Sequence, residues 1–338
     1  MSHKRKIKVN KMKIKQHLAI IGLGLSVGFV HSQTAKSDQA EKVTWPAVLC
    51  AGQPAICTAM PGQGFLFAKS GQNKVVMISH GSQGIDSRMY DYVDALQKDG
   101  FAALVIDHFT PRGVVTTHDD YQGTDRKGAN MRNMALDSLT AAAWLRDIKG
   151  FAKVGSIGES QGGQASQSIQ RTTVMAIVNR NMSRLYGKPF DVKPVDAVVG
   201  LYGYCGYRHY KDDFYVNTPY LMIAGADDDS TPSRYCEEYI PWMNQRGAEG
   251  NAKVVVLPGE GHSFDAPYRR NYSFFPHYAN CNILVDERGA TELNSGITSA
   301  TFREAQIKCE TKGGSHSGYT KGRFNAFPIW LDFFKKNL

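Results

Sequence analysis

The chain of 338 residues lacks several features that would divide it into parts or mark it as a metalloprotein. It has no long Pro/Ser/Gly-rich linker, no internal repeat and no low-complexity tract, which argues against a repeat or multidomain protein. It has no Cys/His spacing typical of zinc and no Asp-x-Asp-x-Asp-Gly loop for calcium. We therefore expect no metal and no cofactor. With 42% hydrophobic residues the chain could form one large domain with a well-buried core or two small ones, and the absence of a dividing linker favours one domain.

Acidic residues are absent from positions 1–32, where seven Lys and Arg residues precede an uncharged apolar run over Leu18–Val30. This run is too short to cross a bilayer as a helix. Small or apolar residues follow at the positions that a signal peptidase recognises. We therefore predict a signal peptide over residues 1–32, cleaved after Ser32, and a periplasmic or secreted protein. A retained membrane anchor is the alternative, whereas a lipoprotein is disfavoured because the first cysteine is Cys50.

The basic character of the chain comes from this leader. The net charge is +9, and removing the seven cationic residues of positions 1–32 leaves +2. A nearly neutral mature chain lacks the electrostatic signature of a nucleic-acid-binding protein. We expect a small-molecule partner, no nucleic acid and no stable membrane anchor after cleavage.

Six cysteines remain after the leader, an even number that is typical of disulfides in an exported protein. Six cysteines allow 15 pairings, so the sequence leaves the connectivity open. Proximity favours Cys50–Cys57 and Cys281–Cys309. Cys205 and Cys236 follow two neighbouring predicted strands and could join their loops. Free buried cysteines are the alternative.

From Lys74 onward, short apolar runs alternate with amphipathic stretches. The runs lack a polar alternation, as expected for strands covered on both faces, and comprise Val75–Ser79, Ala102–Asp107, Ala152–Gly158, Val195–Tyr202, Tyr220–Ala224 and Ala252–Leu257. Helical spacing is found over Arg88–Lys98, Asn130–Ile148, Gln164–Val178, Ser233–Arg246 and Asn325–Leu338. The alternation predicts an α/β domain over residues 74–338, with a mostly parallel, doubly wound sheet flanked by helices.

Two segments lie outside this alternation. Residues 33–73 form an N-terminal segment in which Val43–Ala68 predicts a short antiparallel hairpin at the sheet edge. Asp265–Tyr319 has no clear period and contains two of the cysteines, and it is too long for an ordinary loop. We interpret it as a disulfide-containing insertion near the C-terminus, either a cap or a wall beside the site.

The most informative motif is Gly158-Glu-Ser160-Gln-Gly162, which follows an apolar strand and precedes a helical segment. This strand–turn–helix context is that of a nucleophile elbow, where the tight turn exposes the serine hydroxyl at the end of the sheet. Glycines are needed on either side because a Cβ there would collide with neighbouring backbone. A Gly/Ser-rich loop is the alternative.

An acidic residue and a histidine follow in the order that this fold requires. Asp227, Asp228 and Asp229 follow one predicted strand, and His262 lies in a Gly-bracketed loop after the next. Both loops lie at carboxyl ends of strands, where open α/β sheets assemble their sites. We predict Ser160 as nucleophile, His262 as general base and then acid, and Asp228 as the carboxylate that orients the imidazole.

These motifs resemble those of the dienelactone hydrolase family of α/β-hydrolases, from about Lys74 to His262. Its acid motif Gly-x-x-Asp-x-x-x-Pro matches Gly225, Asp228 and Pro232, and its Gly-His-x-Phe motif matches the four residues from Gly261. Its elbow Gly-x-Cys-x-Gly-Gly has serine here, which departs from the cysteine of the namesake enzymes. The resemblance therefore implies an exported esterase branch with a serine nucleophile.

The same resemblance places an oxyanion hole. We expect the backbone N–H of Gln161 to contribute, together with Ser82 of the His80-Gly-Ser turn, with Gln83 as the alternative. His80 itself is expected to hydrogen-bond loop backbone. Arg112 is predicted to bind a substrate carboxylate through paired hydrogen bonds, and a salt bridge to a loop acid is the alternative.

Other polar and aromatic residues give weaker predictions. The remaining histidines lack ligand spacing and are expected to be surface or loop residues: His108, His118, His209, His277 and His316. An aromatic cluster could either line an acyl pocket or pack loops together, and comprises Tyr202, Tyr204, Tyr207, Tyr210, Phe214 and Tyr215. The sequence leaves that choice open.

Together these features predict an exported serine hydrolase that cleaves a carboxylic ester or lactone through an acyl-enzyme. A peptidase or an acyltransferase with the same triad is one alternative. A non-catalytic secreted binding protein on a hydrolase scaffold is another. All three predicted triad positions are present, which favours the enzyme.

Overall fold

Six neighbouring parallel strands make up most of an eight-stranded sheet in the computed structural model, which describes residues 40–51, 56–117, 121–210, 214–266, 270–316 and 322–338. They are β3 (Lys74–Ser79), β4 (Ala102–Ile106), β5 (Lys153–Glu159), β6 (Ala197–Leu201), β8 (Tyr220–Gly225) and β9 (Ala252–Leu257). The sheet order is β1-β2-β4-β3-β5-β6-β8-β9. The central strands are buried along nearly their whole length, because helices cover both faces.

The predicted edge hairpin consists of β1 (Glu41–Ala51) and β2 (Ile56–Phe67), which pair antiparallel. With 11 and 12 residues, these strands are longer than the short hairpin that we expected. Burial alternates along β1, and the Trp45 ring on its inner face packs 5.8 Å from that of Trp144. β2 then pairs antiparallel with β4 and joins the hairpin to the parallel strands.

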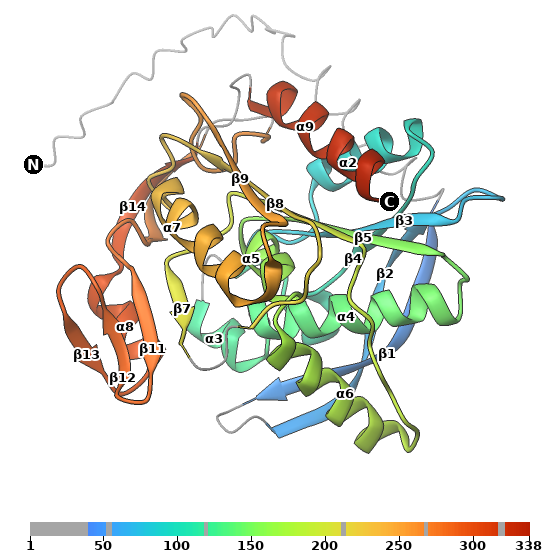
Figure 1. Cartoon of the computed structure of the whole chain (residues 1–338), viewed down its shortest axis with the longest axis horizontal. Coiled ribbons are helices and arrows are strands. Elements are labelled where there is room, and N and C mark those ends of the chain that lie inside the picture. The colour runs from blue at the N-terminus through green and yellow to red at the C-terminus, as the bar shows by residue number, and fades with distance from the viewer. Residues whose placement is uncertain (1–39, 52–55, 118–120, 211–213, 267–269, 317–321) are drawn as a thin grey trace, which may run out of the picture. The chain divides into compact units, whose positions relative to one another are not determined.

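Helices lie on the two faces of the sheet (Figure 1). One face packs against α2 (Ser87–Lys98) and α9 (Gly322–Asn337). The other carries α4 (Met131–Asp147), α6 (Thr172–Tyr186) and α7 (Ser233–Met243), with α5 (Gln161–Ser168) packed between α4 and the strands. A 3-10 turn over Thr110–Arg112 and the short α3 (Tyr121–Arg126) complete the connections. The mostly parallel sheet with flanking helices confirms the predicted fold class.

The segment Gln164–Val178, predicted as one helix, is divided between α5 and α6. Arg171 adopts an extended conformation at the break and forms an isolated bridge with Tyr215, and Thr172 N–H donates to Phe214 O at 2.8 Å. Contacts with a distant segment therefore override the local helical pattern. The segment Ser233–Arg246, also predicted as one helix, forms α7 only as far as Met243, and a π-helical turn follows over Asn244–Ala248.

Where the structure describes it, the aperiodic segment Asp265–Tyr319 contains small sheets rather than an open loop. One pairs β10 (Arg270–His277) with β14 (Thr311–His316). The other has the order β13 (Ile297–Ser299), β12 (Gly289–Glu292), β11 (Ile283–Asp286) and β7 (Tyr207–His209), and carries α8 (Phe302–Cys309). β7 comes from the α/β domain and pairs parallel with β11, so the insertion is attached to the central fold through backbone hydrogen bonds.

Disulfides tie the loops at three places, and each pairing that proximity favoured is confirmed. Cys50–Cys57 closes the hairpin, Cys205–Cys236 joins the loop after β6 to α7, and Cys281–Cys309 holds α8 in the insertion. Restricting the unfolded chain in this way stabilises the native state, more so for the longer loops.

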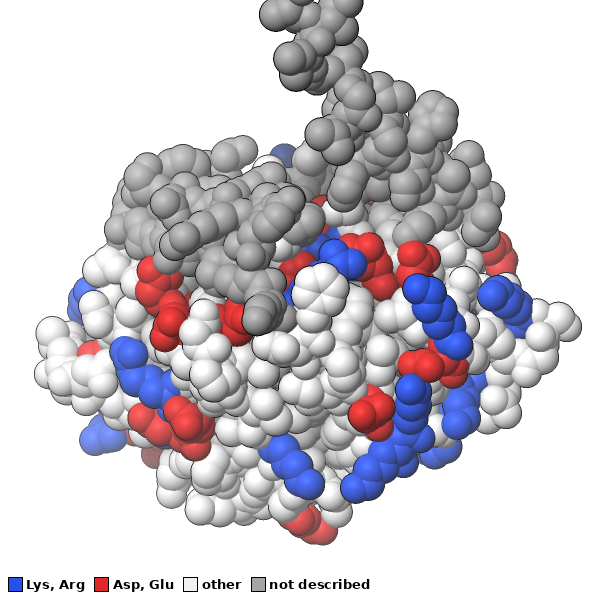
Figure 2. All heavy atoms as spheres, turned by 90° about the horizontal axis from the view of Figure 1, so that it is seen from above, with Lys and Arg blue, Asp and Glu red and all other residues white. Residues whose placement is uncertain are grey.

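The surface over α2 and α9 carries both signs of charge. Arg323 pairs with Asp91 at 3.0 Å and Lys335 with Asp99 at 3.0 Å, so ion pairs join the two helices. Seen from above, cationic and anionic side chains are interspersed on the part of this face that the structure describes (Figure 2). Within the described residues, no helix combines the length and hydropathy needed to cross a bilayer. The predicted leader, residues 1–32, lies outside the described residues.

Candidate active site

Ser160 lies at the turn between β5 and α5 and has the left-handed φ of +48° that a nucleophile elbow imposes. A Cβ on Gly158 would collide with Gly162 O, and a Cβ on Gly162 would collide with Ser79 O. The turn is held from the neighbouring strand, because Ser160 N–H donates to Leu201 O at 2.9 Å. Both glycines are therefore required by close backbone approach, as the motif predicts.

A chain of hydrogen bonds runs from Ser160 through His262 to Asp228. Ser160 Oγ lies 3.0 Å from His262 Nε2, and His262 Nδ1 lies 2.9 Å from Asp228 Oδ2. His262 and Asp228 are buried, and Ser160 is partly exposed. The three residues come from loops after β5, β9 and β8, so the carboxyl ends of parallel strands in one sheet bring them together. Such a chain can remove the serine proton as the hydroxyl attacks an electrophile.

Asp228 is the aspartate that contacts His262, as the family motif predicts. Its Oδ1 accepts backbone N–H groups from Ser230 at 2.9 Å and Thr231 at 2.7 Å, which fixes the carboxylate plane. Asp227 is exposed, and Asp229 is partly exposed and lies 3.7 Å from His277 Nε2. Only one member of the triple-Asp turn is therefore placed to orient the imidazole.

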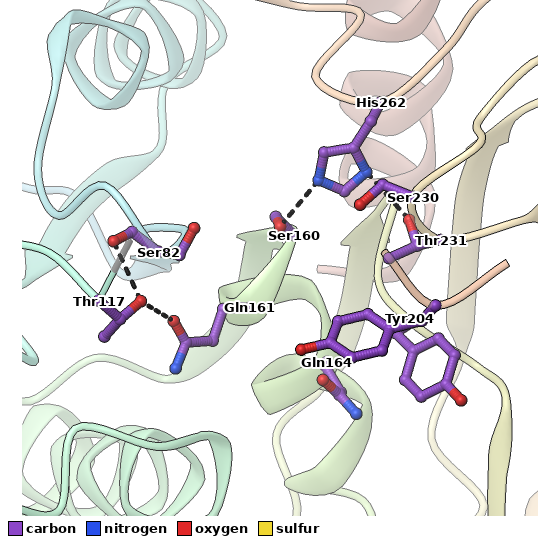
Figure 3. Close-up of a pocket in the computed structure, with 10 residues that line it drawn as sticks. Ser82, Thr117, Ser160, Gln161, Gln164, Tyr204, Ser230, Thr231 and His262 are labelled. Atoms are coloured by element: carbon purple, nitrogen blue, oxygen red, sulfur yellow. Dashed lines mark hydrogen bonds between the residues drawn. The ribbon is translucent and has the colours of Figure 1, made fainter. Parts of the chain in front are cut away.

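A pocket opens beside Ser160 and His262, with Ser82 and Gln161 on its wall (Figure 3). Thr117 joins these two residues: its hydroxyl lies 3.2 Å from Ser82 O and 3.2 Å from Gln161 Oε1. Its N–H also donates to Ser82 O at 2.9 Å. Gln83, the alternative to Ser82, is not among the lining residues. Thr117 was not predicted from sequence, because it lies in a loop outside the motifs that mark the site.

Arg112 does not reach this pocket, and the predicted role in substrate binding is wrong for this geometry. Its terminal nitrogens donate to both carboxylate oxygens of Asp137, at 2.8 and 3.0 Å, and Nη1 also donates to His108 O at 2.6 Å. The Arg112 side chain is only 1% exposed, so its paired hydrogen bonds are used within the protein. The acid that binds it lies on α4, whereas the alternative prediction was a loop acid.

His108 lies in the loop after β4, one of the two positions expected of it, but it is fully buried rather than at the surface. Its Nδ1 lies 2.9 Å from Asp137 Oδ2 and its Nε2 lies 3.1 Å from Ser79 Oγ. His80 hydrogen-bonds backbone as expected, with Nδ1 at 2.8 Å from Gly81 O, and its Nε2 accepts the His108 N–H. Burial and the neighbouring His108 lower the pKa of His80 to about 3, so this imidazole stays neutral.

Beneath the site lies a buried charge cluster that the sequence did not indicate. Arg88 on α2 pairs with Asp86 at 2.6 Å and with Glu159, the residue before the nucleophile, at 2.5 Å. Glu159 Oε1 accepts the Gly81 N–H at 3.1 Å, which links the elbow to the loop that carries Ser82. The cluster therefore joins two walls of the site through one carboxylate.

The same cluster reaches the histidine loop through Tyr202 and Asp265. The Tyr202 hydroxyl lies 2.7 Å from Glu159 Oε2 and 2.6 Å from Asp265 Oδ1, and Asp265 also accepts the Tyr92 hydroxyl. Burial raises the pKa of Glu159, and burial raises the pKa of Asp265 to about 6. The Tyr202 hydroxyl has one proton and cannot donate fully to both Glu159 and Asp265. The raised pKa values are consistent with a second proton held on one of these two carboxyl groups.

The aromatic cluster has divided roles. The Tyr202 ring packs edge-on against His262 with centroids 5.0 Å apart, and Tyr202 O accepts the Thr231 hydroxyl at 3.0 Å. Tyr204 lines the pocket. Tyr210 and Phe214 are more than half exposed and lie against Arg246. Part of the cluster therefore forms the site and part packs loops.

The sheet order and the strand–turn–helix elbow define the α/β-hydrolase fold. The described residues contain no group of three or more His, Cys, Asp or Glu side chains placed to hold a metal ion. None of the known protein-family models matches the chain. A 59-residue segment is 37% identical to a putative carboxymethylenebutenolidase of Escherichia coli (strain K12). It spans 17% of this chain and 20% of that protein, so the match covers a fifth of the relative.

Within that fold, the chain is similar to the dienelactone hydrolase-like α/β-hydrolases. A dienelactone hydrolase-like promiscuous phosphotriesterase from metagenomic libraries is 19% identical, with a TM-score of 0.44 over 67% of this chain and 85% of that one. A dienelactone hydrolase from Anabaena variabilis is also 19% identical, with a TM-score of 0.42 over 68% and 91%. A Pyrococcus furiosus esterase is 15% identical, with a TM-score of 0.42 over 68% and 85%.

Proposed function

We propose that the protein is an exported serine hydrolase that cleaves a carboxylic ester or lactone through an acyl-enzyme intermediate. The observation that carries the proposal is the hydrogen-bonded chain from Ser160 Oγ through His262 to Asp228, with Ser160 at a strained elbow beside a pocket. The similarity to dienelactone hydrolase-like proteins is consistent with the same class of substrate.

In the first half-reaction, Ser160 Oγ attacks the carbonyl carbon while its proton passes to His262 Nε2. The carbonyl oxygen becomes an oxyanion, which the backbone N–H groups of Gln161 and Ser82 would stabilise. When the tetrahedral intermediate collapses, the ester C–O bond breaks and His262 returns the proton to the departing alcohol. Asp228 stabilises the imidazolium that exists between these two proton transfers.

In the second half-reaction, water attacks the acyl-serine ester and gives its proton to His262. Collapse releases the carboxylic acid, and His262 returns the proton to Ser160. A lactone follows the same steps, except that its alcohol stays covalently attached to the acyl group throughout, so deacylation releases a single hydroxy acid.

Export is part of the proposal and is supported by two features. Residues 1–32 have the composition of a signal peptide, and three disulfides are expected in an oxidising compartment such as the periplasm or the extracellular space.

The proposal is tested by measuring p-nitrophenyl acetate hydrolysis by the mature chain and by Ser160→Ala. We expect wild-type turnover and a loss of at least about a thousandfold in the variant, because the nucleophile is removed. Acid quenching and mass spectrometry should also find an acetyl group on Ser160 during turnover. Equal rates in the two proteins, with both shown folded by circular dichroism, would refute the mechanism.

A further inference from the structure

The pocket beside Ser160 has an unusual lining for an ester site. Every described residue on its wall carries a hydroxyl, amide or imidazole group, and none is aliphatic or is a Lys, Arg, Asp or Glu. An acyl site for fatty chains is expected to present mostly apolar side chains. A site for an anionic acyl group is expected to present an Arg or Lys. Most of the surface that these residues present to the pocket is nonetheless apolar, so the wall suits an uncharged group, and a preference for a polar one must come from the few polar atoms that face it.

The pocket is also small. Its cavity volume is about 50 Å³, whereas one water molecule needs roughly 10–15 Å³ measured in the same way. It therefore holds about four water-sized atoms. A group of three or four non-hydrogen atoms beyond the ester carbonyl fits this space, and a long alkyl chain does not.

Most polar groups of the wall already have hydrogen-bond partners. The Tyr204 hydroxyl donates to backbone oxygens, with Cys281 O at 2.7 Å and Gly206 O at 2.9 Å, so its ring forms an inert wall. The Thr231 hydroxyl contacts Tyr202 O and Asp228 Oδ2, at 3.0 and 2.8 Å. These groups are committed to the protein and cannot bind a substrate without losing those contacts.

Two buried polar atoms of the wall, unlike these groups, lack a hydrogen-bond partner among the described residues. Gln164 Nε2 and Ser230 Oγ have no hydrogen-bond partner within the described part of the chain, although the two residues are only 5% and 1% exposed. A buried amide N–H without a partner is costly, because it gave up hydrogen bonds to water. An acceptor atom on a bound substrate would satisfy it.

The position of Gln164 indicates which part of the ester it meets. In Figure 3, Gln164 lies with Tyr204 on the side of Ser160 away from His262. His262 must protonate the leaving alcohol, so the alcohol lies toward His262 and the acyl group extends the other way. The acyl group therefore enters the part of the pocket that Gln164 lines.

We propose that this pocket is an acyl site for short, uncharged acyl groups that carry an oxygen acceptor, and that Gln164 determines this specificity. The inference rests on the proposed function, because it requires an acyl-enzyme at Ser160. The Gln164 amide donates to the acyl oxygen. An acyl group that carries a carboxylate would need a cationic partner in the pocket. Arg112 does not provide one, because its guanidinium is bound to Asp137.

The test compares p-nitrophenyl methoxyacetate with p-nitrophenyl butyrate, two esters with equally long acyl groups that differ by an oxygen in place of a methylene. The ether oxygen also activates the carbonyl, so the ratio of their kcat/KM values is compared between proteins and the intrinsic reactivity cancels. In Gln164→Met we expect this ratio to fall about fivefold, the effect of one neutral hydrogen bond. A ratio within twofold of wild type would overturn the assignment of Gln164.

Gln167→Met is the matched control. Gln167 lies on the same helix, is fully buried and has both amide atoms without partners in the described structure, but it does not line the pocket. Its removal should leave the substrate ratio unchanged. A fall equal to that of Gln164→Met would attribute the effect to loss of a buried amide and overturn the specificity role.

Measurements on the wild-type protein test the site without any variant. We expect kcat/KM for the octanoate and the hemisuccinate p-nitrophenyl esters to be at least tenfold below that for the butyrate. Faster hydrolysis of either would overturn the short, uncharged acyl site. Absence of turnover with every ester would overturn the proposed function as well, whereas turnover with the wrong preferences would overturn the acyl site alone.

Discussion

Replacing Asp228 by Asn tests the proposed role of the carboxylate with little change in shape. Asp228 Oδ1 accepts two backbone N–H groups, from Ser230 and Thr231, and an Asn side chain keeps them only if its oxygen occupies the same position. The amide NH2 must then take the place of Oδ2 and face His262 Nδ1. A donor in that position makes Nδ1 the acceptor and leaves the proton on Nε2, where Ser160 needs a base.

The expected loss follows from this tautomer. The equivalent substitution in a serine protease lowers kcat by about 10⁴-fold, which corresponds to about 5 kcal/mol of activation free energy. The Thr231 hydroxyl, 3.0 Å from His262 Nδ1, is uncharged and would stabilise the imidazolium far less than the Asp228 carboxylate does. We therefore expect Asp228→Asn to reduce kcat for p-nitrophenyl acetate by about 10³- to 10⁴-fold, with a melting temperature close to that of wild type.

Two neighbours in the same turn provide matched controls. Asp227→Asn and Asp229→Asn remove the same charge from exposed or partly exposed positions, so we expect kcat within about twofold of wild type. Steady-state kinetics of the three variants, each checked for folding by circular dichroism, decides between them. Similar losses in all three, or more than about a tenth of wild-type activity in Asp228→Asn, would refute the assignment.

The remaining predictions concern stability. Folding raises the pKa of Asp265 from its ordinary 3.8 to about 6, so the folded protein binds this proton more tightly than the unfolded chain does. The resulting stabilisation is full below about pH 4 and disappears as the pH rises through about 6. The advantage of wild type over Asp265→Asn in urea unfolding should therefore shrink by up to about 3 kcal/mol between pH 4 and pH 7, and an equal advantage at both would contradict it. Replacing Cys205 and Cys236 together by Ala should lower the free energy of unfolding by roughly 3–4 kcal/mol, since their separation is 31 residues; a loss below about 1 kcal/mol would show that this bridge constrains the unfolded chain little.

Much of the central domain can be predicted from sequence because its signals are local. Strands such as β4 and β8 are continuous apolar runs, and the elbow needs glycines at fixed offsets from Ser160. The positions of Asp228 and His262 follow from the same rule, since both lie after carboxyl ends of parallel strands.

The features that escaped prediction depend on contacts between distant segments. Glu159 looks like an exposed turn residue in sequence, yet Arg88, 71 positions earlier, pairs with it in the interior. Arg112 has the chemistry of a carboxylate ligand, but its partner Asp137 is found only when α4 packs beside its loop. The strands of the insertion have no clear hydrophobic period, so the sequence alone did not indicate them. They are held in place by pairing with β7 and by the Cys281–Cys309 bridge, which are contacts between distant segments.

The most direct test of the account is labelling of the folded mature protein with a fluorophosphonate, followed by mapping of the modified peptide. The hydrogen-bonded chain through His262 predicts stoichiometric modification at Ser160 that is lost on heat denaturation and in Ser160→Ala. Modification elsewhere, or no modification of a demonstrably folded sample, would contradict an activated serine at the elbow.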